Sequence, residues 1–452
     1  MSPAIEFDLT TPELSHLTSG DALVSRTIHP SGLRILTEQV PGAHSTSLGF
    51  WIAVGSRDED SVAYGSTHFL EHLLFKGTKT RSALDIAIAF DSVGGEHNAL
   101  TAKEHTCYYA KVQDRDVSMA IEVLADMLAD SVIDQREFEV ERQVILEELA
   151  MADDDPSDVA HERITELVFG DHPLGRPIGG SGDTIRAATR ESVFAHYEKH
   201  YRPRELVVTA AGALEHSDIV EKVLAGLTQA GWDLTTPAAP APRRSTLPAE
   251  LGVSTPTRII KRPLEQAVVA LATTGLLAHD DRRYQLAVLS SVLGGGMSSR
   301  LFQEVREKRG LAYSVYSFQS SYADAGMFGM AAGTSPGSAN EVAKLLIGEL
   351  EQVASEGISE AELARTAGNL AGASALALES SDTRMMRLGR SELVTGEYVD
   401  RDEALARFAR VGRADVKQLA NTLVEQSFSA VVVGKVDDTV FDGMSHLNGS
   451  GS

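Results

Sequence analysis

The sequence predicts an α+β protein made of two tandem homologous domains, each a mostly antiparallel β-sheet packed against α-helices. The chain of 452 residues is too long for one ordinary domain. A proline-rich stretch divides it nearly in half, and the predicted strands and helices follow the same order on both sides. Matched landmarks keep an almost constant spacing: Ile133 and Ile358 lie 225 residues apart, Val193 and Val416 lie 223 apart, and Gly212 and Gly434 lie 222 apart.

The dividing stretch, residues 236–250, has four prolines and almost no large apolar side chain, which is typical of an extended linker. We therefore predict an N-terminal domain over residues 1–235 and a C-terminal domain over residues 251–440. Residues 441–452 end in Asn-Gly-Ser-Gly-Ser and are predicted to form a flexible tail.

Each half is predicted to open with a pair of strands and to close with a helix followed by a strand. The opening strands are residues 31–35 and 48–52 in the first half and 257–260 and 267–270 in the second. Apolar spacing predicts matching helices over residues 120–129 and 342–353. The closing pairs are helix 193–201 with strand 206–210, and helix 416–423 with strand 430–433.

The composition limits the class of protein. A hydrophobic share of 43% with 23% charged residues is that of a soluble globular chain, and no apolar run reaches the roughly 18 residues that cross a membrane. With 41 basic against 64 acidic residues, a net charge of -23 argues against nucleic acid as a partner. Cys107 is the only cysteine and residues 1–25 show no targeting signal, so we expect a cytoplasmic protein.

The clearest chemical signal is the run His-Phe-Leu-Glu-His at residues 68–72. Ser66 or Thr67 is placed to cap a helix that stops at a glycine at position 77. On such a helix His68, Glu71 and His72 share one face. Two imidazoles one turn apart can bind one Zn²⁺, with a carboxylate beside them as a base. The alternative is a pair of surface histidines on an amphipathic helix.

A catalytic zinc usually has three protein ligands, so a third must come from elsewhere in the chain. In a helix predicted over residues 134–152, Glu148 shares a partly apolar, inward face with Val144, Ile145 and Glu141, whereas Glu147 lies on another stripe with Gln143. A carboxylate that faces inward needs a cation to neutralise it, and zinc would do so. Glu141 is then placed to support a ligand histidine. The alternative is a solvated acidic helix face.

Five stretches of this sequence together resemble a known family. Residues 68–78, 94–112, 141–149 and 172–180 in the first half, and 293–317 in the second, are similar to the pitrilysin-type zinc metallopeptidases. The similarity is greatest to bacterial homologues of the β subunit of the mitochondrial processing peptidase. It covers the chain from about Leu33 to Val436.

The resemblance implies roles for the motif residues. His68, His72 and Glu148 would be the ligands of one Zn²⁺ per chain, Glu71 the general base, and Glu141 a supporting residue at the metal. These roles agree with the reading of the residues themselves.

The resemblance also implies substrate contacts in both halves. Asn98 and Ala99 match the edge strand on which the family aligns its peptide substrate. Arg306 and Tyr313, seven residues apart, match an arginine and a tyrosine that bind the substrate carbonyl and its oxyanion. Without the resemblance, Asn98 would be a turn residue, Arg306 a member of a surface ion pair and Tyr313 an ordinary strand aromatic.

We therefore expect a zinc endopeptidase of the bacterial cytoplasm that hydrolyses short or unfolded peptides inside a closed chamber. The second half has no matching histidine motif, so we expect only one metal site per chain. Family members with four such domains close into a chamber around the substrate, so the resemblance implies that this two-domain chain forms a homodimer whose active sites are shared between chains. A phosphate-binding loop is excluded because no Lys-Ser or Lys-Thr follows the glycines at 294–296. Cys107 is expected to be a packed thiol. The alternatives are a structural or docking subunit, as in respiratory-complex core proteins, and a peptide-binding chaperone that cleaves slowly.

Overall fold

The structure is a computed structural model that describes residues 4–60, 63–251 and 257–447. The chain folds into two compact units, each made of three separate segments. Unit 1 comprises Met1–Leu149, Pro177–Arg243 and Ser374–Glu403. Unit 2 comprises Ala150–Arg176, Arg244–Ala373 and Ala404–Ser452.

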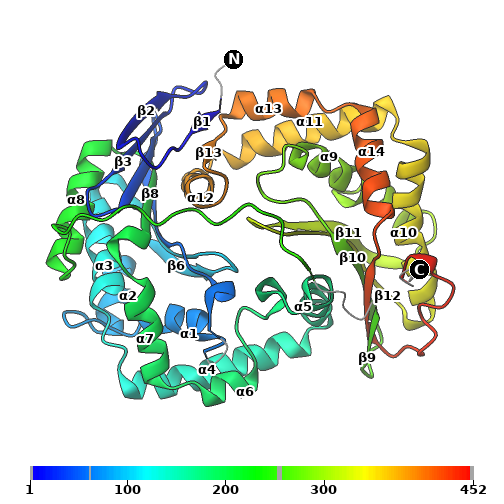
Figure 1. Ribbon diagram of the computed structural model, residues 1–452, viewed down its shortest axis with the longest axis horizontal. Helices are drawn as coiled ribbons and strands as arrows, with labels where there is room; N and C mark the ends of the chain where they lie inside the picture. The colour runs from blue at the N-terminus through cyan, green and yellow to red at the C-terminus, as the bar shows by residue number, and fades with distance from the viewer. Residues whose placement is uncertain (1–3, 61–62, 252–256, 448–452) are drawn as a thin grey trace. The chain divides into compact units, whose positions relative to one another are not determined.

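Unit 1 is built on a 7-stranded sheet with the order β2-β3-β4-β8-β5-β7-β6 within the described residues. Figure 1 labels β2, β3, β6 and β8 of this sheet. Its strands are β2 (Glu13–Leu17), β3 (Leu23–Ile28), β4 (Arg34–Gln39), β5 (Ser45–Ile52), β6 (Glu96–Thr101), β7 (Thr106–Gln113) and β8 (Leu206–Gly212). The pairing is antiparallel except between β4 and β8. A short pair, β1 (Ile5–Glu6) with β13 (Glu397–Tyr398), completes the strands of this unit.

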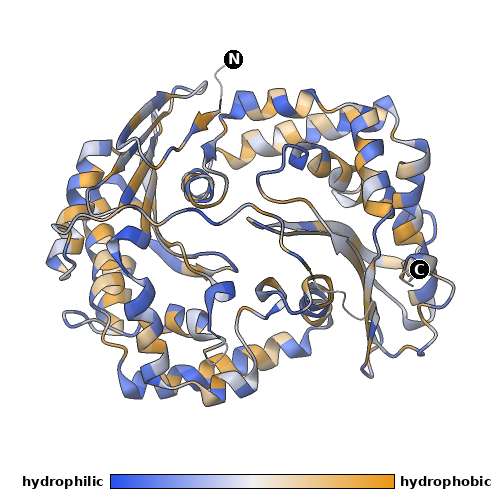
Figure 2. Cartoon of the chain, in the orientation of Figure 1, coloured by the Kyte–Doolittle hydropathy of each residue, from blue (hydrophilic) through white to orange (hydrophobic). Residues whose placement is uncertain are grey.

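Helices on one face of this sheet enclose the main core of unit 1, which includes Phe50, Phe69 and Leu124. These helices are α1 (Ser66–Leu74), α2 (Ala83–Asp91), α3 (Val117–Asp130), α4 (Gln135–Asp154), α6 (Gly182–Ala187), α7 (Arg190–His200) and α8 (His216–Gln229). Hydrophobic and hydrophilic residues alternate along these helices, which Figure 2 shows as orange and blue turns of the ribbons.

The opposite face of the unit 1 sheet is covered by α12 (Ser381–Arg390), which comes from the second half of the chain and packs on β8, β5 and β4. Met385 and Leu388 are fully buried there against Trp51. A Cβ on Gly389 would lie 2.3 Å from the Trp51 ring, so only glycine fits this close approach. The helix continues into a π-helical turn, η7 (Ser391–Thr395).

Unit 2 is built on a 5-stranded sheet with the order β11-β12-β10-β14-β9 within the described residues. Its strands are β9 (Thr257–Lys261), β10 (Ala267–Thr274), β11 (Ala312–Ser321), β12 (Gly326–Thr334) and β14 (Ser429–Gly434). Its helices are α9 (Arg283–Gly294), the π-helical turn η5 (Phe302–Glu307), α10 (Ala339–Glu356) and α14 (Arg413–Val424). Helices α11 (Glu360–Ala377) and α13 (Arg401–Ala409) have residues in both units, and so does α4.

The remaining elements are short 3-10 turns. They are η1 (Ser56–Asp58), η2 (Asp114–Asp116), η3 (Pro173–Gly175), η4 (Pro203–Glu205), η6 (Pro336–Ser338) and η8 (Ser445–Leu447).

The second face of the unit 2 sheet is covered by α5 (Pro156–Phe169), which comes from the first half of the chain. Its apolar residues Val159, Ile164 and Leu167 pack on β10 and β14. Helices α5 and α12 occupy matching places in the two repeats, so the two halves exchange one helix. The predicted α+β fold of two similar domains is present. Continuous domains over residues 1–235 and 251–440 were expected, whereas each compact unit is made of segments from both halves of the sequence.

Two further expectations differ from the structure in detail. The stretch 236–250 contains no helix or strand, yet it is held in place: the Ala241 N–H donates to Arg204 O at 2.9 Å, and Arg243 bonds the buried carboxylate of Glu392 at 3.0 Å. The predicted flexible tail was wrong for residues 441–447, because Met444 and Leu447 are buried in the unit 2 core. The last five residues of the predicted tail lie outside the described part of the chain. In the described part, no helix has the length and apolarity needed to cross a membrane.

Candidate metal centre

Helix α1 begins at a glycine and is capped by a distant carboxylate. Gly65 is the N-cap residue and has a left-handed φ of 90°. As a glycine it has no side chain that could accept a capping hydrogen bond. Instead, Glu59 accepts hydrogen bonds from the N–H groups of Gly65 at 2.8 Å and Thr67 at 2.7 Å. The predicted cap by Ser66 or Thr67 was therefore wrong: Glu59 supplies the negative charge that a helix N-terminus favours.

A second glycine holds the start of α1 against the loop before α6. Gly180 has a left-handed φ of 72°, and a Cβ there would lie 2.7 Å from Thr184 Oγ1 and 3.1 Å from the Gly65 Cα. Larger residues at either glycine would push the two segments apart. The contact therefore requires glycine at position 180, the last residue of the stretch 172–180.

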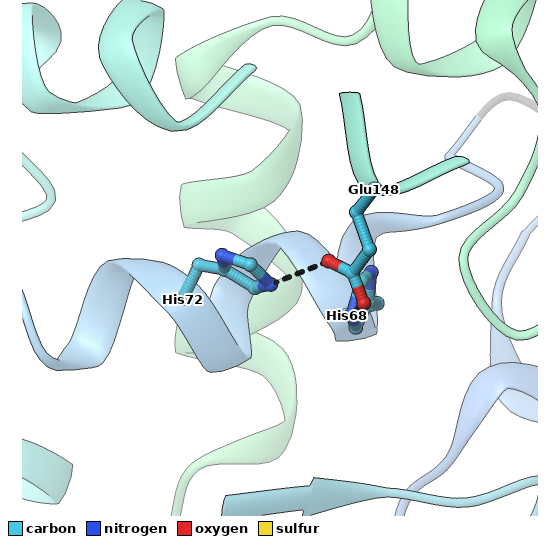
Figure 3. A group of neighbouring side chains, drawn as sticks. All are labelled: His68, His72 and Glu148. Carbon is cyan, nitrogen blue, oxygen red and sulfur yellow. Dashed lines mark ion pairs between the residues drawn. The ribbon is translucent and has the colours of Figure 1, made fainter. Parts of the chain in front are cut away.

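His68, His72 and Glu148 form one cluster. Each contributes an atom to a group in which all the atoms lie within 4.8 Å of one another. Figure 3 shows the two imidazoles on successive turns of α1, with the Glu148 carboxylate reaching them from another segment, helix α4. Glu148 Oε1 is 3.7 Å from His68 Nε2, and Oε2 is 3.4 Å from His72 Nε2.

The cluster fits a tetrahedral zinc site. Ligand atoms about 2.1 Å from a tetrahedral metal lie roughly 3.4 Å apart. The two printed separations between Glu148 and the histidines are near this value, and the three ligand atoms lie within 4.8 Å of one another. Two imidazoles and one carboxylate are also a donor set of catalytic zinc sites, which leave one position open. The Glu148 side chain is 53% exposed, whereas those of His68 and His72 are only 14% and 20% exposed, so the cluster is reached from the Glu148 side.

A buried carboxylate orients the second histidine. Glu141, with only 2% of its surface exposed, accepts a hydrogen bond from His72 Nδ1 at 3.1 Å. Its other oxygen pairs with Lys76 Nζ at 2.7 Å. With Nδ1 protonated, His72 presents the lone pair of Nε2 toward Glu148, the tautomer that a metal requires. Glu141 therefore lies in contact with a predicted ligand histidine.

His68 differs from His72 in its surroundings. Its Nδ1 is buried and has no hydrogen-bond partner among the described residues. Burial lowers the pKa of His68 and the neighbouring His72 lowers it further, whereas Glu148 and Glu71 act in the opposite direction. The net effect favours the neutral imidazole, which is the form that binds metal.

The carboxylate of Glu71 lies on the same helix and is held by a neighbouring strand. The hydroxyl of Thr101, at the end of β6, donates a hydrogen bond to Glu71 Oε2. Glu71 is partly exposed, so a water molecule can reach it. Asn98 and Ala99 lie on the same strand, and β6 is the outermost strand of the sheet in the described residues, as expected for an edge strand.

Arg306 and Tyr313 contact each other in unit 2. Arg306 Nη1 donates to the backbone oxygen of Tyr313 at 2.8 Å, and its guanidinium lies 4.6 Å from the centre of the Tyr313 ring. The Tyr313 side chain is 78% exposed. The simple ion-pair reading of Arg306 is weak, since its Glu307 contact is 4.0 Å long and Glu304 pairs with Lys308 instead.

Two residues beside the cluster were not predicted: Lys76, which pairs with Glu141, and Thr101, which bonds Glu71. Lys76 follows His72 by one helical turn, a spacing that places both beside the same neighbour. Thr101 follows Ala99 by two residues on a strand, so their side chains share a face. Both signals are visible in the sequence once Glu141 and Ala99 are placed. Cys107 is fully buried as expected, and burial raises the pKa of its thiol well above the ordinary value.

Two repeated sheets and a His-His-Glu cluster define a two-unit α+β protein with a candidate catalytic metal centre. Residues 34–182 match the family described as Insulinase (Peptidase family M16), and residues 187–370 match the Peptidase M16 inactive domain. An uncharacterized zinc protease of Streptomyces coelicolor is 47% identical over 422 residues, which are 93% of this chain and 91% of that protein. The uncharacterized zinc protease YmxG of Bacillus subtilis is 38% identical over 413 residues, 91% of this chain and 98% of that protein. The chain therefore belongs to peptidase family M16.

Solved structures support the same fold. A protease from Helicobacter pylori matches with a TM-score of 0.83 at 22% identity, covering 93% of this chain and all 100% of that one. A peptidase M16 inactive domain from Pseudomonas fluorescens matches with a TM-score of 0.79 at 21% identity, over 91% of this chain and 98% of that one. The family and the names of its relatives place this chain among the peptidases, in a family that also contains inactive members.

Proposed function

We propose that the protein is a zinc endopeptidase that hydrolyses short or unfolded peptides, with one Zn²⁺ per chain. The observation that carries this proposal is the His68, His72 and Glu148 cluster, with the Glu71 carboxylate on the same helix. Relatives named zinc proteases add support, and so does the hydrogen bond from His72 to Glu141.

In this mechanism, His68, His72 and Glu148 hold the metal, which when bound polarises the scissile carbonyl and acidifies the attacking water. Glu71 takes the proton of that water during attack on the carbonyl carbon. It then delivers the proton to the leaving amine as the carbon–nitrogen bond breaks. Glu141 keeps His72 in the tautomer that exposes Nε2.

We propose that the substrate adds to the open edge of β6 as an extra strand, with Asn98 and Ala99 among its contacts. Main-chain hydrogen bonds would give affinity with little reading of sequence. Such pairing requires an extended peptide, so folded proteins would be poor substrates.

The direct test compares the wild type with Glu71→Gln. We expect about one zinc per chain in both proteins, measured by elemental analysis, and cleavage of a mixed peptide library by the wild type alone. A Glu71→Gln variant that cleaves at the wild-type rate would contradict the mechanism. A wild type that binds zinc and cleaves nothing would favour a docking subunit or a peptide-binding chaperone instead.

We further propose a homodimer of the cytoplasm, in which Arg306 and Tyr313 of one copy bind the substrate carbonyl at the zinc of the other inside a closed chamber. Two inactive variants, Glu71→Gln and Arg306→Ala, would then complement each other when mixed. Random pairing predicts recovery of about one quarter of wild-type activity, because one site of each mixed dimer is intact. A fully active monomer in sedimentation would exclude the shared site.

A further inference from the structure

The general base proposed above has a single anchor. Within the described residues, the Thr101 hydroxyl is the only hydrogen-bond partner of the Glu71 carboxylate. Thr101 is the last residue of β6 and is 7% exposed, so its hydroxyl is shielded from competition by bulk water. Its side chain lies on the same face of β6 as those of His97 and Ala99, the face that packs toward α1.

The main chain of Thr101 points in a different direction from its side chain, to the open edge of the sheet. In the β6–β7 hairpin, the Ala102 N–H donates to His105 O at 2.9 Å. Hydrogen-bonded positions alternate along an antiparallel pair, so Leu100 and Asn98 face β7 while Thr101 and Ala99 face outward.

An independent contact agrees with this register. The Ala99 N–H donates at 2.8 Å to the side-chain oxygen of Asn98, as expected for a group on the open edge. Thr101, two residues further along, carries its own N–H and carbonyl on that same edge.

We propose that Thr101 is a positioning residue that ties the general base to the strand on which the substrate lies. Its main chain belongs to the docking edge, and its hydroxyl holds the carboxylate of Glu71. One residue thus sets the distance between the scissile bond of a docked peptide and the base. This proposal rests on the proposed peptidase function.

The consequence is kinetic. A glutamate side chain can rotate around three single bonds. Without the Thr101 hydroxyl, the Glu71 carboxylate loses the hydrogen bond that fixes its position. Misplacing a reacting group by about 1 Å can reduce a rate on the order of 100-fold. Substrate affinity and metal binding depend on other atoms, so they should remain unchanged.

The test uses two pairs of variants that differ by the same hydroxyl. Wild type and Thr101→Val have nearly equal volume, as do Thr101→Ser and Thr101→Ala. In each pair we expect kcat of peptide cleavage to fall about 10- to 100-fold when the hydroxyl is absent, with KM and zinc content within about twofold. Because the Ser and Ala variants share any packing defect, their ratio reports the hydroxyl even if the Val variant is unstable.

A matched control lies directly across the hairpin. Thr106 pairs with Thr101, is fully buried, and donates its hydroxyl to Val54 O at 3.0 Å. Thr106→Val removes a structural hydrogen bond of similar kind. It should lower the melting temperature and leave kcat within about twofold of the wild type.

Several outcomes would overturn the assignment. Wild-type kcat in Thr101→Val and Thr101→Ala, or equal rates for the Ser and Ala variants, would show that the hydroxyl has no role in positioning. If the wild type cleaves and Glu71→Gln does not, a failure of these variants rejects only the role of Thr101. A wild type without activity rejects the proposed function and this inference together.

Discussion

Units 1 and 2 repeat one arrangement of strands but differ in the side chains that it carries. The order β6-β7-β5-β8-β4 in unit 1 matches β11-β12-β10-β14-β9 in unit 2, and each set has a single parallel pair, β4 with β8 and β9 with β14. Helices α4 and α11 begin at residues 135 and 360, an offset of 225. This offset allows the metal centre to be compared position by position.

At an offset of 225, Glu141 corresponds to Thr366 and Glu148 to Ala373. Glu141 and Thr366 are both buried on their helices, at 2% and 5% exposure, so the place in the fold is kept while the carboxylate is lost. Helix α9, which follows the strand matching β5, contains neither histidine nor carboxylate. The same arrangement of strands thus forms in unit 2 without the proposed metal ligands, and a few substitutions separate the two units chemically.

The largest expected effect comes from giving unit 1 the residue of unit 2 at the third ligand. Glu148→Ala should leave the fold intact, because this side chain is half exposed and Ala373 occupies the matching place in α11. With one of three ligands gone, we expect zinc to be lost on dialysis and peptide cleavage to fall on the order of 1000-fold or more. Elemental analysis and a peptide assay check both.

The control for this change is the adjacent residue. Glu147 is exposed on the same helix and makes no contact with the cluster, so Glu147→Ala should retain zinc and activity. If Glu148→Ala kept its zinc while Glu147→Ala lost it, the third ligand would be the neighbouring residue. Retention of zinc in both variants would show that Glu148 is not a ligand.

A smaller effect, on zinc affinity, is expected from substitution of the buried Glu141. Glu141→Thr copies Thr366 and removes the carboxylate that orients His72 and pairs with Lys76. Loss of such an orienting partner typically weakens metal affinity about 10- to 100-fold. Competition with a zinc chelator would measure the change, with Glu147→Thr as the exposed control. An affinity equal to that of the wild type would mean that α1 alone fixes the His72 ring.

The residues that the sequence could predict are those whose geometry is local. His68, Glu71 and His72 share a face through helical spacing alone, and the same spacing places Glu148 on one stripe of α4 with Glu141. The expectation that Glu148 faces inward was wrong, because its side chain is 53% exposed and Val144 on the same stripe is exposed as well. Most strands and helices near the three repeat landmarks lie where their apolar patterns predicted them.

Features that depend on distant segments were not predictable. The Glu59 cap of α1 replaces a nearer serine or threonine because Gly65 turns the chain through a left-handed conformation. The exchange of α5 and α12 is likewise invisible to periodicity, because each helix has an apolar face that fits either sheet. The contact between Thr101 and Glu71 joins residues 30 positions apart on different elements, so only the folded chain brings them together.

The smallest expected effect concerns stability, and it also comes from the comparison of units. Helices α7 and α14 begin at residues 190 and 413, so His196 corresponds to Leu419, and both are buried. His196 Nε2 lies 3.2 Å from the hydroxyl of Thr67 in the first turn of α1. Burial lowers the pKa of His196 to about 4, with further lowering by His200 and Lys199 against the opposite effect of Asp58 and Asp60.

The ordinary pKa of histidine is 6.5, so below this pH His196 takes up a proton in the unfolded chain. In the folded chain it stays neutral down to about pH 4. The free energy of unfolding therefore falls as the pH drops through this window, by up to about 1.4 kcal/mol per pH unit from this group. His196→Leu, which copies unit 2, should flatten that dependence. Denaturant unfolding of the metal-free proteins at several pH values between 7.5 and 4.5 would measure it, since the other histidines are common to both. Parallel curves would mean that His196 is protonated in the folded protein, with Asp58 and Asp60 outweighing its burial.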